Sequence, residues 1–310
     1  MKKILLLPFA LLPFLFSFSQ KTKQDGASAS TSNVDGYPKT LLWKISGNGL
    51  KKPSYLFGTM HILCADDAQL SDSLKEAIHK TDEVYFEIDL TDMKGMMNSL
   101  KYMRMNDEKR LSDILSADDY AKVKAYFETH PTMLPFGMLE RFKPLLISSI
   151  VEENDLDCKA TNGMEMVIMK EAKDQNKKIH GLETAEFQSS LFDSIPYEKQ
   201  AKDLVDYLDS STQYKKMTDT LALAYKQQDL QRIDELTTKE DPSMSNYMDL
   251  MLYDRNRKWI RELKKIMIEK SVLIAVGAGH LPGEKGVINL LKKNGYKVTP
   301  VKNPAHLENL

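Results

Sequence analysis

The stretch SVLIAVGAGHLPG, residues 271–283, decides the fold of this chain. Its apolar run does not alternate with polar residues, which is typical of a central strand that is covered on both faces of a sheet. The run stops at Gly277, and His280 follows three residues later. Such a strand needs partners on both sides, and the rest of the sequence must supply them.

The stretch SYLFGTMH, residues 54–61, repeats this pattern with Gly58 and His61. Folds with a central sheet bind ligands beyond the carboxyl ends of their strands. If the two strands are neighbours, His61 and His280 therefore face one pocket. A loop histidine after a glycine is also common as a simple turn residue, and spacing alone leaves that alternative open.

Three glycines lie at these two strand ends, namely Gly58, Gly277 and Gly279. Glycine permits positive φ and a sharp exit from the sheet, and it removes side-chain bulk. We therefore expect these residues to shape the pocket and to let a ligand approach the backbone closely.

The remaining pattern predicts an α/β fold. Two apolar runs, at 41–45 and 54–60, flank GNGLKKP and predict a hairpin. Further strands are expected at 83–90, 176–184 and 295–301, whereas the pattern between about 91 and 268 is mostly helical. The prediction is one domain over residues 41–303, with a central mixed sheet built from both chain ends and a large helical insertion at about 91–268.

The N-terminus has the features of an export signal. Two lysines precede an apolar run from Ile4 to Phe18, and small residues follow, so residues 1–19 are expected to be a signal peptide. An uncleaved anchor is the alternative, although the run is short for a membrane span. Residues 20–40 are rich in Ser, Thr, Gly and Lys and are expected to form a flexible linker. The chain is thus expected in the periplasm or the medium, with no stable membrane insertion after cleavage.

The charge and the cysteines limit the partners and the compartment. The formal net charge is -1 without blocks of like charge, so no nucleic-acid partner is expected. Cys64 and Cys158 are the two cysteines, and in an exported chain they could pair. A small buried thiol is the alternative for each, because sequence does not show whether the two come within bridging distance.

Glu87 is a third candidate for the pocket. It lies near the end of the apolar strand EVYFEIDL, where a buried carboxylate needs a partner. Two histidines and one carboxylate are a common set of ligands for a hydrolytic metal ion. The alternative is a charge on an edge strand that faces solvent. The sequence contains no G-x-S-x-G, no phosphate-binding G-x-x-x-x-G-K-[ST] and no H-E-x-x-H motif.

These residues carry a family resemblance. The segments YLFGTMH, VYFEIDLTD, HGLETAEFQ, DRNRKWI and VGAGHLPGEKGVINLLKKNGYKV resemble the TraB/PrgY/GumN family, which includes the animal TIKI proteases. The resemblance spans about residues 41–301. It implies a core similar to the erythromycin esterase and ChaN-like proteins, and metal-dependent hydrolysis with a divalent ion such as Mn, Co or Zn.

Residue by residue, the resemblance assigns His61 and His280 to metal binding. It assigns Glu87 either to metal binding, as the third ligand, or to catalysis, as the general base. Arg255 and Asn256 match a family Arg-Asn pair, and the resemblance makes Arg255 a catalytic candidate that orients Glu87 or holds an oxyanion. Asn256 and Glu183 are supporting residues.

One further segment departs from the family pattern. The chain has Gly163-Met164-Glu165 where the family often has Gly-x-Asp, which leaves the role of that carboxylate open.

The predicted function is therefore an exported metal-dependent hydrolase, most simply a peptidase that acts on a peptide or protein substrate. Two alternatives remain at this point. The chain could sequester a peptide or another ligand without cleaving it, or it could be a metal-free, esterase-like hydrolase that uses a histidine and a glutamate as acid and base. The oligomeric state is not predicted.

Overall fold

A mixed sheet of six strands is the centre of the computed structural model, which describes residues 36–239 and 246–304. The strand order is β6-β4-β7-β2-β1-β8, and a separate two-stranded ribbon pairs β3 with β5. Strands from both chain ends lie in one sheet, so the predicted α/β fold class is confirmed. The strands are β1 (Leu42–Ser46), β2 (Ser54–Thr59), β3 (Leu63–Cys64), β4 (Glu83–Ile88), β5 (Thr161–Asn162), β6 (Lys178–Glu183), β7 (Val272–Gly277) and β8 (Lys297–Pro300).

The pairing of the strands follows the sequence pattern. β1 and β2 form the predicted antiparallel hairpin, and β8 pairs with the other edge of β1. β2, β7, β4 and β6 are parallel to one another, so their carboxyl ends share one edge of the sheet. β7 lies between β2 and β4, and its residues before Gly277 are all buried, as its unbroken apolar run requires.

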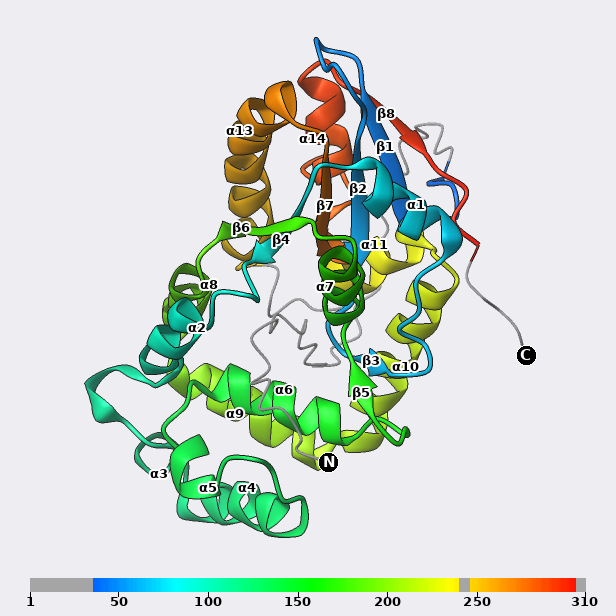
Figure 1. The fold of residues 1–310 in the computed structure, drawn as a ribbon. Helices are drawn as coiled ribbons and strands as arrows, with labels where there is room; N and C mark the ends of the chain where they lie inside the picture. Colours follow the sequence, from blue (N-terminus) through cyan, green and yellow to red (C-terminus); the bar gives the residue numbers. More distant parts are fainter. Residues whose placement is uncertain (1–35, 240–245, 305–310) are drawn as a thin grey trace, which may run out of the picture.

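Helices cover both faces of the sheet and extend beyond the carboxyl ends of its strands (Figure 1). They are α1 (Asp72–Lys80), α2 (Met93–Ser99), α3 (Leu111–Ile114), α4 (Ala117–Thr129), α5 (Phe136–Leu139), α6 (Pro144–Asn154), α7 (Met164–Asp174), α8 (Ala185–Leu191), α9 (Tyr197–Asp209), α10 (Ser211–Lys226), α11 (Leu230–Lys239), α13 (Asp254–Glu269) and α14 (Val287–Lys293). A π-helical turn, η4 (Asp249–Tyr253), precedes α13, and a 3-10 turn, η5 (Ala278–His280), follows β7.

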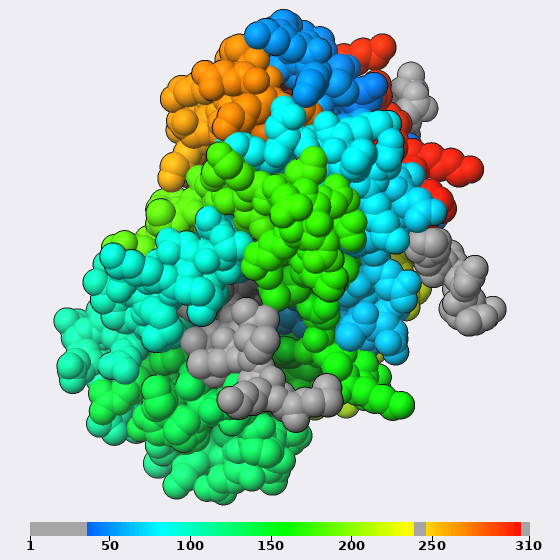
Figure 2. Space-filling model, viewed as in Figure 1, coloured from blue at the N-terminus to red at the C-terminus, as the bar shows by residue number. Residues whose placement is uncertain are grey.

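The connections between parallel strands place these helices. α1 and α7 pack together on one face of the sheet, and α13 and α14 pack together on the other. This follows from right-handed crossovers, because α1 and α7 connect strands in one direction along the sheet and α13 and α14 connect strands in the opposite direction. The predicted helical insertion therefore returns to the sheet once, through α7 and β6. α6 and α9 pack against each other across from the strand ends. In Figure 2, the cyan and green segments cover one face of the molecule.

Local signals explain where individual helices begin. The sequence predicts a helix over 69–80, but α1 begins only at Asp72 because Ser71 is its N-cap and accepts a hydrogen bond from the Leu74 amide at 3.0 Å. The buried face of α1 has the expected helical spacing. Asp92 caps α2 in the same way, with the Gly95 amide as donor at 2.9 Å.

The predicted signal peptide at 1–19 and most of the predicted linker at 20–40 lie outside the described residues. Among the residues that are described, no helix combines the length and the apolar character needed to cross a membrane.

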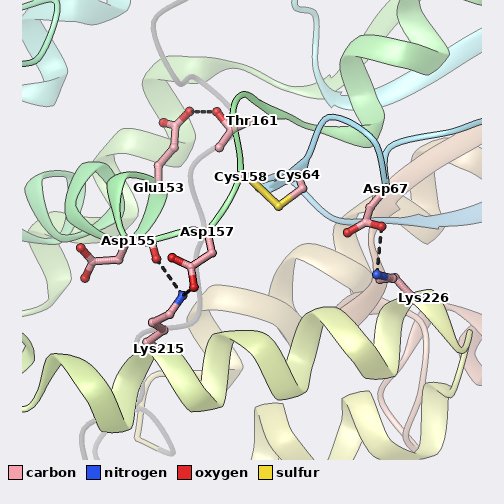
Figure 3. The surroundings of a disulfide bond; sticks show 9 residues. All are labelled: Cys64, Asp67, Glu153, Asp155, Asp157, Cys158, Thr161, Lys215 and Lys226. Carbon is pink, nitrogen blue, oxygen red and sulfur yellow. Dashed lines mark hydrogen bonds and ion pairs between the residues drawn. A yellow bond between two sulfur atoms is a disulfide. The ribbon is translucent and has the colours of Figure 1, made fainter. Parts of the chain in front are cut away.

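A disulfide joins Cys64 to Cys158, with Cα atoms 5.6 Å apart (Figure 3). This settles the question that the sequence leaves open. The bond lies beside the ribbon in which Leu63 pairs with Asn162 and Cys64 with Thr161. It therefore fastens the loop after β2, which carries His61, to the segment that leads into α7.

Replacement of both cysteines by serine is expected to lower the free energy of unfolding by about 2–4 kcal/mol, because the disulfide closes a loop with a sequence separation of 94 residues. Urea unfolding of the two proteins measures this difference. A reductant should shift the midpoint of the natural chain and leave that of the serine variant unchanged. Equal midpoints for both proteins without reductant would contradict the expectation.

Candidate active site

Three strand ends bring His61, His280 and Glu87 to one place. β2 and β7 are neighbours with Thr59 opposite Gly277, and β4 lies on the other side of β7. A Cβ atom built on Gly277 would lie 3.2 Å from Glu87 Oε1, 3.6 Å from the ring of His280 and 3.7 Å from His61 Nε2. All three predicted side chains therefore border the space that the missing side chain of this glycine leaves.

The glycines act through space and not through positive φ, which corrects one expectation. Among the described residues, neither Gly58 nor Gly277 has a positive φ. Gly58 lies inside β2, and a Cβ there would meet Ala278 and Leu281 at 3.1 Å. It lets η5 pack against the strand, whereas Gly277 and Gly279 line the pocket itself.

Glu87 is buried, with 7% of its surface exposed, so it is not a solvent-facing edge charge. Its Oε1 accepts a hydrogen bond from the Gly277 amide at 2.8 Å, and its Oε2 accepts from Gln188 Nε2 at 3.0 Å and from Arg255 Nη2 at 2.5 Å. Burial alone would raise the pKa of Glu87, but the charge of Arg255 outweighs it and holds the pKa well below its usual range. Glu87 is therefore ionised at neutral pH.

Arg255 connects three elements from the start of α13. Its Nε donates to Glu183 Oε2 on β6 at 3.0 Å, and its Nη1 donates to the Met251 carbonyl at 2.9 Å. The guanidinium also packs on the ring of Trp259, 4.9 Å from its centroid. Arg255 is 1% exposed and does not line the pocket. Its contacts orient Glu87 and Glu183 from behind the pocket wall.

His280 is held as a neutral imidazole. Its Nδ1 lies 2.6 Å from Asn256 Oδ1, which can only accept, so we place the ring proton on Nδ1. Its Nε2 then carries the lone pair and lies 3.2 Å from Arg255 Nη1 and 3.7 Å from Glu87 Oε1. Burial lowers the pKa of His280 to about 3, despite the neighbouring Glu87. Asn256 is itself fixed by donating to the Lys285 carbonyl at 3.0 Å.

His61 has a carboxylate partner, Glu165, at the start of α7. Its Nδ1 lies 2.7 Å from Glu165 Oε1, while its Nε2 borders the space at Gly277. Burial lowers the pKa of His61, but the charge and hydrogen bond of Glu165 outweigh it and raise the pKa to about 9. A Cβ on Gly163 would meet the His61 carbonyl at 2.5 Å, so this glycine allows the close approach of the two segments.

A pocket of about 100 Å³ opens from these side chains toward the helices. Its walls are mostly apolar and come from the loop after β2, from α10 and from α11. Glu152 on α6 and Tyr207 on α9 also line it, so it reaches the helical part of the chain. A small polar group set against apolar walls is the usual composition of a substrate site.

The donor atoms suit a divalent metal ion in kind. His61 Nε2, the Cδ2 edge of the His280 ring and Glu87 Oε1 border a common space. The Nδ1 of each histidine lies near an oxygen, at 2.7 Å from Glu165 Oε1 for His61 and at 2.6 Å from Asn256 Oδ1 for His280. In metal sites, an acceptor bound to the other ring nitrogen orients each histidine ligand. In the arrangement of residues 36–239 and 246–304, however, no three His, Cys, Asp or Glu side chains gather closely enough to hold an ion. Metal binding would therefore require these side chains to move closer together.

Sequence reasoning missed two contributors to the site. Glu165 was noted only as a departure from a family pattern, yet it is the partner of His61. Gln188 bridges Glu87 at 3.0 Å and Glu183 at 3.3 Å. The segment HGLETAEFQ, which carries part of the family resemblance, contains both Glu183 and Gln188, but the sequence did not predict that the amide would contact Glu87.

Comparison with known proteins finds similarity over most of the chain. The chain is 24% identical to Metalloprotease TIKI1 of Danio rerio over 86% of this chain and 64% of that protein. It is 23% identical to Metalloprotease TIKI1 of Homo sapiens (86% and 63%) and to Metalloprotease TIKI2 of Xenopus tropicalis (89% and 62%). The matched region is thus less than two thirds of each of these relatives. No solved structure matches the chain. The TraB/PrgY/gumN family profile matches residues 41–300, and the chain belongs to that family.

Proposed function

We propose that this protein is an exported metal-dependent hydrolase that cleaves peptide bonds. The observation that carries the proposal is the convergence of His61, His280 and Glu87 around Gly277, with each histidine directed by an acceptor at its Nδ1. The relatives that are named metalloproteases support the reaction class.

In this proposal His61, His280 and Glu87 hold the ion. When bound there, a divalent ion such as Mn, Co or Zn would polarise the scissile carbonyl as a Lewis acid. Glu165 and Asn256 fix the orientation of the two histidine rings through their Nδ1 atoms. Arg255 keeps Glu87 ionised and fixed, and its burial makes it a positioning residue for Glu87 and not an oxyanion donor.

A metal-free hydrolase is the second candidate, and one contact favours it. The Arg255 guanidinium already lies beside both Glu87 Oε2 and His280 Nε2, so a cation stands next to two of the three ligands. In such an enzyme, histidine and glutamate would act as acid and base. Removal of divalent metals distinguishes the two candidates, because only the metal-dependent enzyme loses activity.

The disulfide supports the proposed export. Disulfides form and persist in oxidising compartments such as the bacterial periplasm and the extracellular medium. The bond between Cys64 and Cys158 fastens the loop that carries His61. A site that depends on this bond needs an oxidising compartment, which supports export. Location can be followed by fractionation of cells that express the full chain.

The natural protein is expected to cleave members of a mixed library of unstructured peptides when manganese is present. Mass spectrometry detects the products. Chelation and the Glu87→Gln variant should each abolish cleavage, because chelation removes the ion and the substitution removes one of its proposed ligands. Cleavage that survives chelation but not Glu87→Gln would favour the metal-free enzyme. If the peptides are bound without a change in mass, the chain sequesters its ligand instead.

Gly277→Ala is expected to reduce hydrolysis about 100-fold, because the added methyl group enters the space between Glu87 and the two histidines. The backbone of Gly277, with φ -48° and ψ 136°, is accessible to alanine, so the fold should persist. Gly137→Ala is the matched control, since a Cβ there meets nothing within 4 Å. Thermal unfolding of both variants checks the fold. Full activity of Gly277→Ala would argue against a reaction at this point.

A further inference from the structure

The pocket contains one acidic side chain that the proposed reaction does not use. Glu152 lines the pocket from α6, across from the strand ends that carry the reactive residues. One buried water needs a volume of about 10–15 Å³. The cavity of about 100 Å³ is several times larger and can receive an amino-acid side chain. Glu152 can therefore meet a substrate group that enters from the site at Gly277.

Glu152 has no compensating partner in the described part of the chain. It is 8% exposed, and within the described residues no hydrogen bond reaches its carboxyl group. Burial and the neighbouring carboxylate of Asp155 raise the pKa of Glu152 well above its ordinary value. A buried acid is costly unless a ligand or another group satisfies it. The end of the pocket thus favours a ligand that brings a positive charge or a hydrogen-bond donor.

Lys215, a lysine of helix α10, contacts other acceptors. Lys215 of α10 contacts the Asp157 carboxylate at 2.9 Å and donates to the Asp155 carbonyl at 3.1 Å (Figure 3). It is not among the residues that line the pocket. The ammonium group of Lys215 therefore leaves the carboxyl group of Glu152 available to a ligand.

The other surfaces of the pocket suit a long side chain with a charged end. Met217 and Leu221 of α10 provide an apolar wall between the strand ends and Glu152. Tyr207 and Tyr214 line the same pocket as Glu152, and their rings stack with centroids 4.8 Å apart. Aromatic rings attract cations, and the methylene groups of a lysine or arginine side chain pack on apolar surface.

We propose that this pocket binds a lysine or arginine side chain of the peptide substrate, with Glu152 as the residue that sets this specificity. The methylene stem would lie against Met217 and Leu221, and the cationic end would pair with Glu152 beside the two tyrosines. This inference rests on the proposed function for the identity of the substrate as a peptide. A protonated acid that merely completes the core would show no preference for a basic side chain.

The test uses three acetylated and amidated pentapeptides, Ala-Ala-Xaa-Ala-Ala, in which Xaa is lysine, arginine or norleucine. Norleucine has the stem of lysine without the charge. Hydrolysis in the presence of manganese and binding measured by titration calorimetry are followed with the full chain. We expect the basic peptides to be preferred over the norleucine peptide on the order of 100-fold, as for other buried charge pairs.

Glu152→Gln should remove most of this preference, while the neighbouring Glu153→Gln should keep it. Glu153 is the matched control because its carboxylate accepts from Thr161 and does not line the pocket. Glu152→Leu should reverse the order and favour norleucine. Thermal unfolding checks each variant, and glutamine has the size and neutral form of the buried acid, so the fold should persist.

Failure of this inference and failure of the proposed function give different results. If no peptide is cleaved but the lysine peptide binds more tightly than the norleucine peptide in a manner that depends on Glu152, the pocket is as proposed and the reaction is not. Equal binding of the lysine and norleucine peptides, or tighter binding of norleucine by the natural chain, would overturn the inference whether or not cleavage occurs.

Discussion

The buried ion pairs of Arg255 are the interaction on which the rest of the site depends. Glu87 and Glu183 come from two neighbouring strands, and both are buried. Burial of their two negative charges would cost much free energy without a neighbouring cation. Arg255 lies within 2.9 Å of Glu183 and 2.5 Å of Glu87. Loss of one partner of such a group typically destabilises a protein by about 3–5 kcal/mol, because a buried charge is left uncompensated.

The same arginine places the groups that border the pocket. With Oε2 of Glu87 held by Arg255, Oε1 remains to accept from the Gly277 amide, and this bond directs the chain as it leaves β7. The next residue of α13, Asn256, accepts the hydrogen bond that Nδ1–H of His280 donates. Two adjacent residues of one helix thus order a carboxylate and a histidine that lie on different strand ends. On the other side, the disulfide and the β3–β5 ribbon bring His61 to Glu165.

Sequence alone predicted the parts of this arrangement that depend on local periodicity. The unbroken apolar run of β7, the hairpin of β1 and β2, and the glycine before each histidine are visible over a few residues. The pairing of His61 with Glu165, the disulfide, and the wall with Glu152 depend on how helices far apart in the chain pack together. No local pattern encodes those contacts. The expectation of positive φ at Gly58 and Gly277 was wrong, because close packing and not turn geometry requires glycine at these positions.

The central claim is that His61 and His280 hold a divalent ion together with Glu87, and metal binding itself tests it most directly. The full chain would be titrated with Mn²⁺, with free and bound ion followed by electron paramagnetic resonance and nitrogen couplings measured by its pulsed form. We expect one ion per chain, coupled to two imidazole nitrogens and lost when His61 and His280 are both replaced by alanine. Absence of binding, or binding that survives the double replacement, would contradict it.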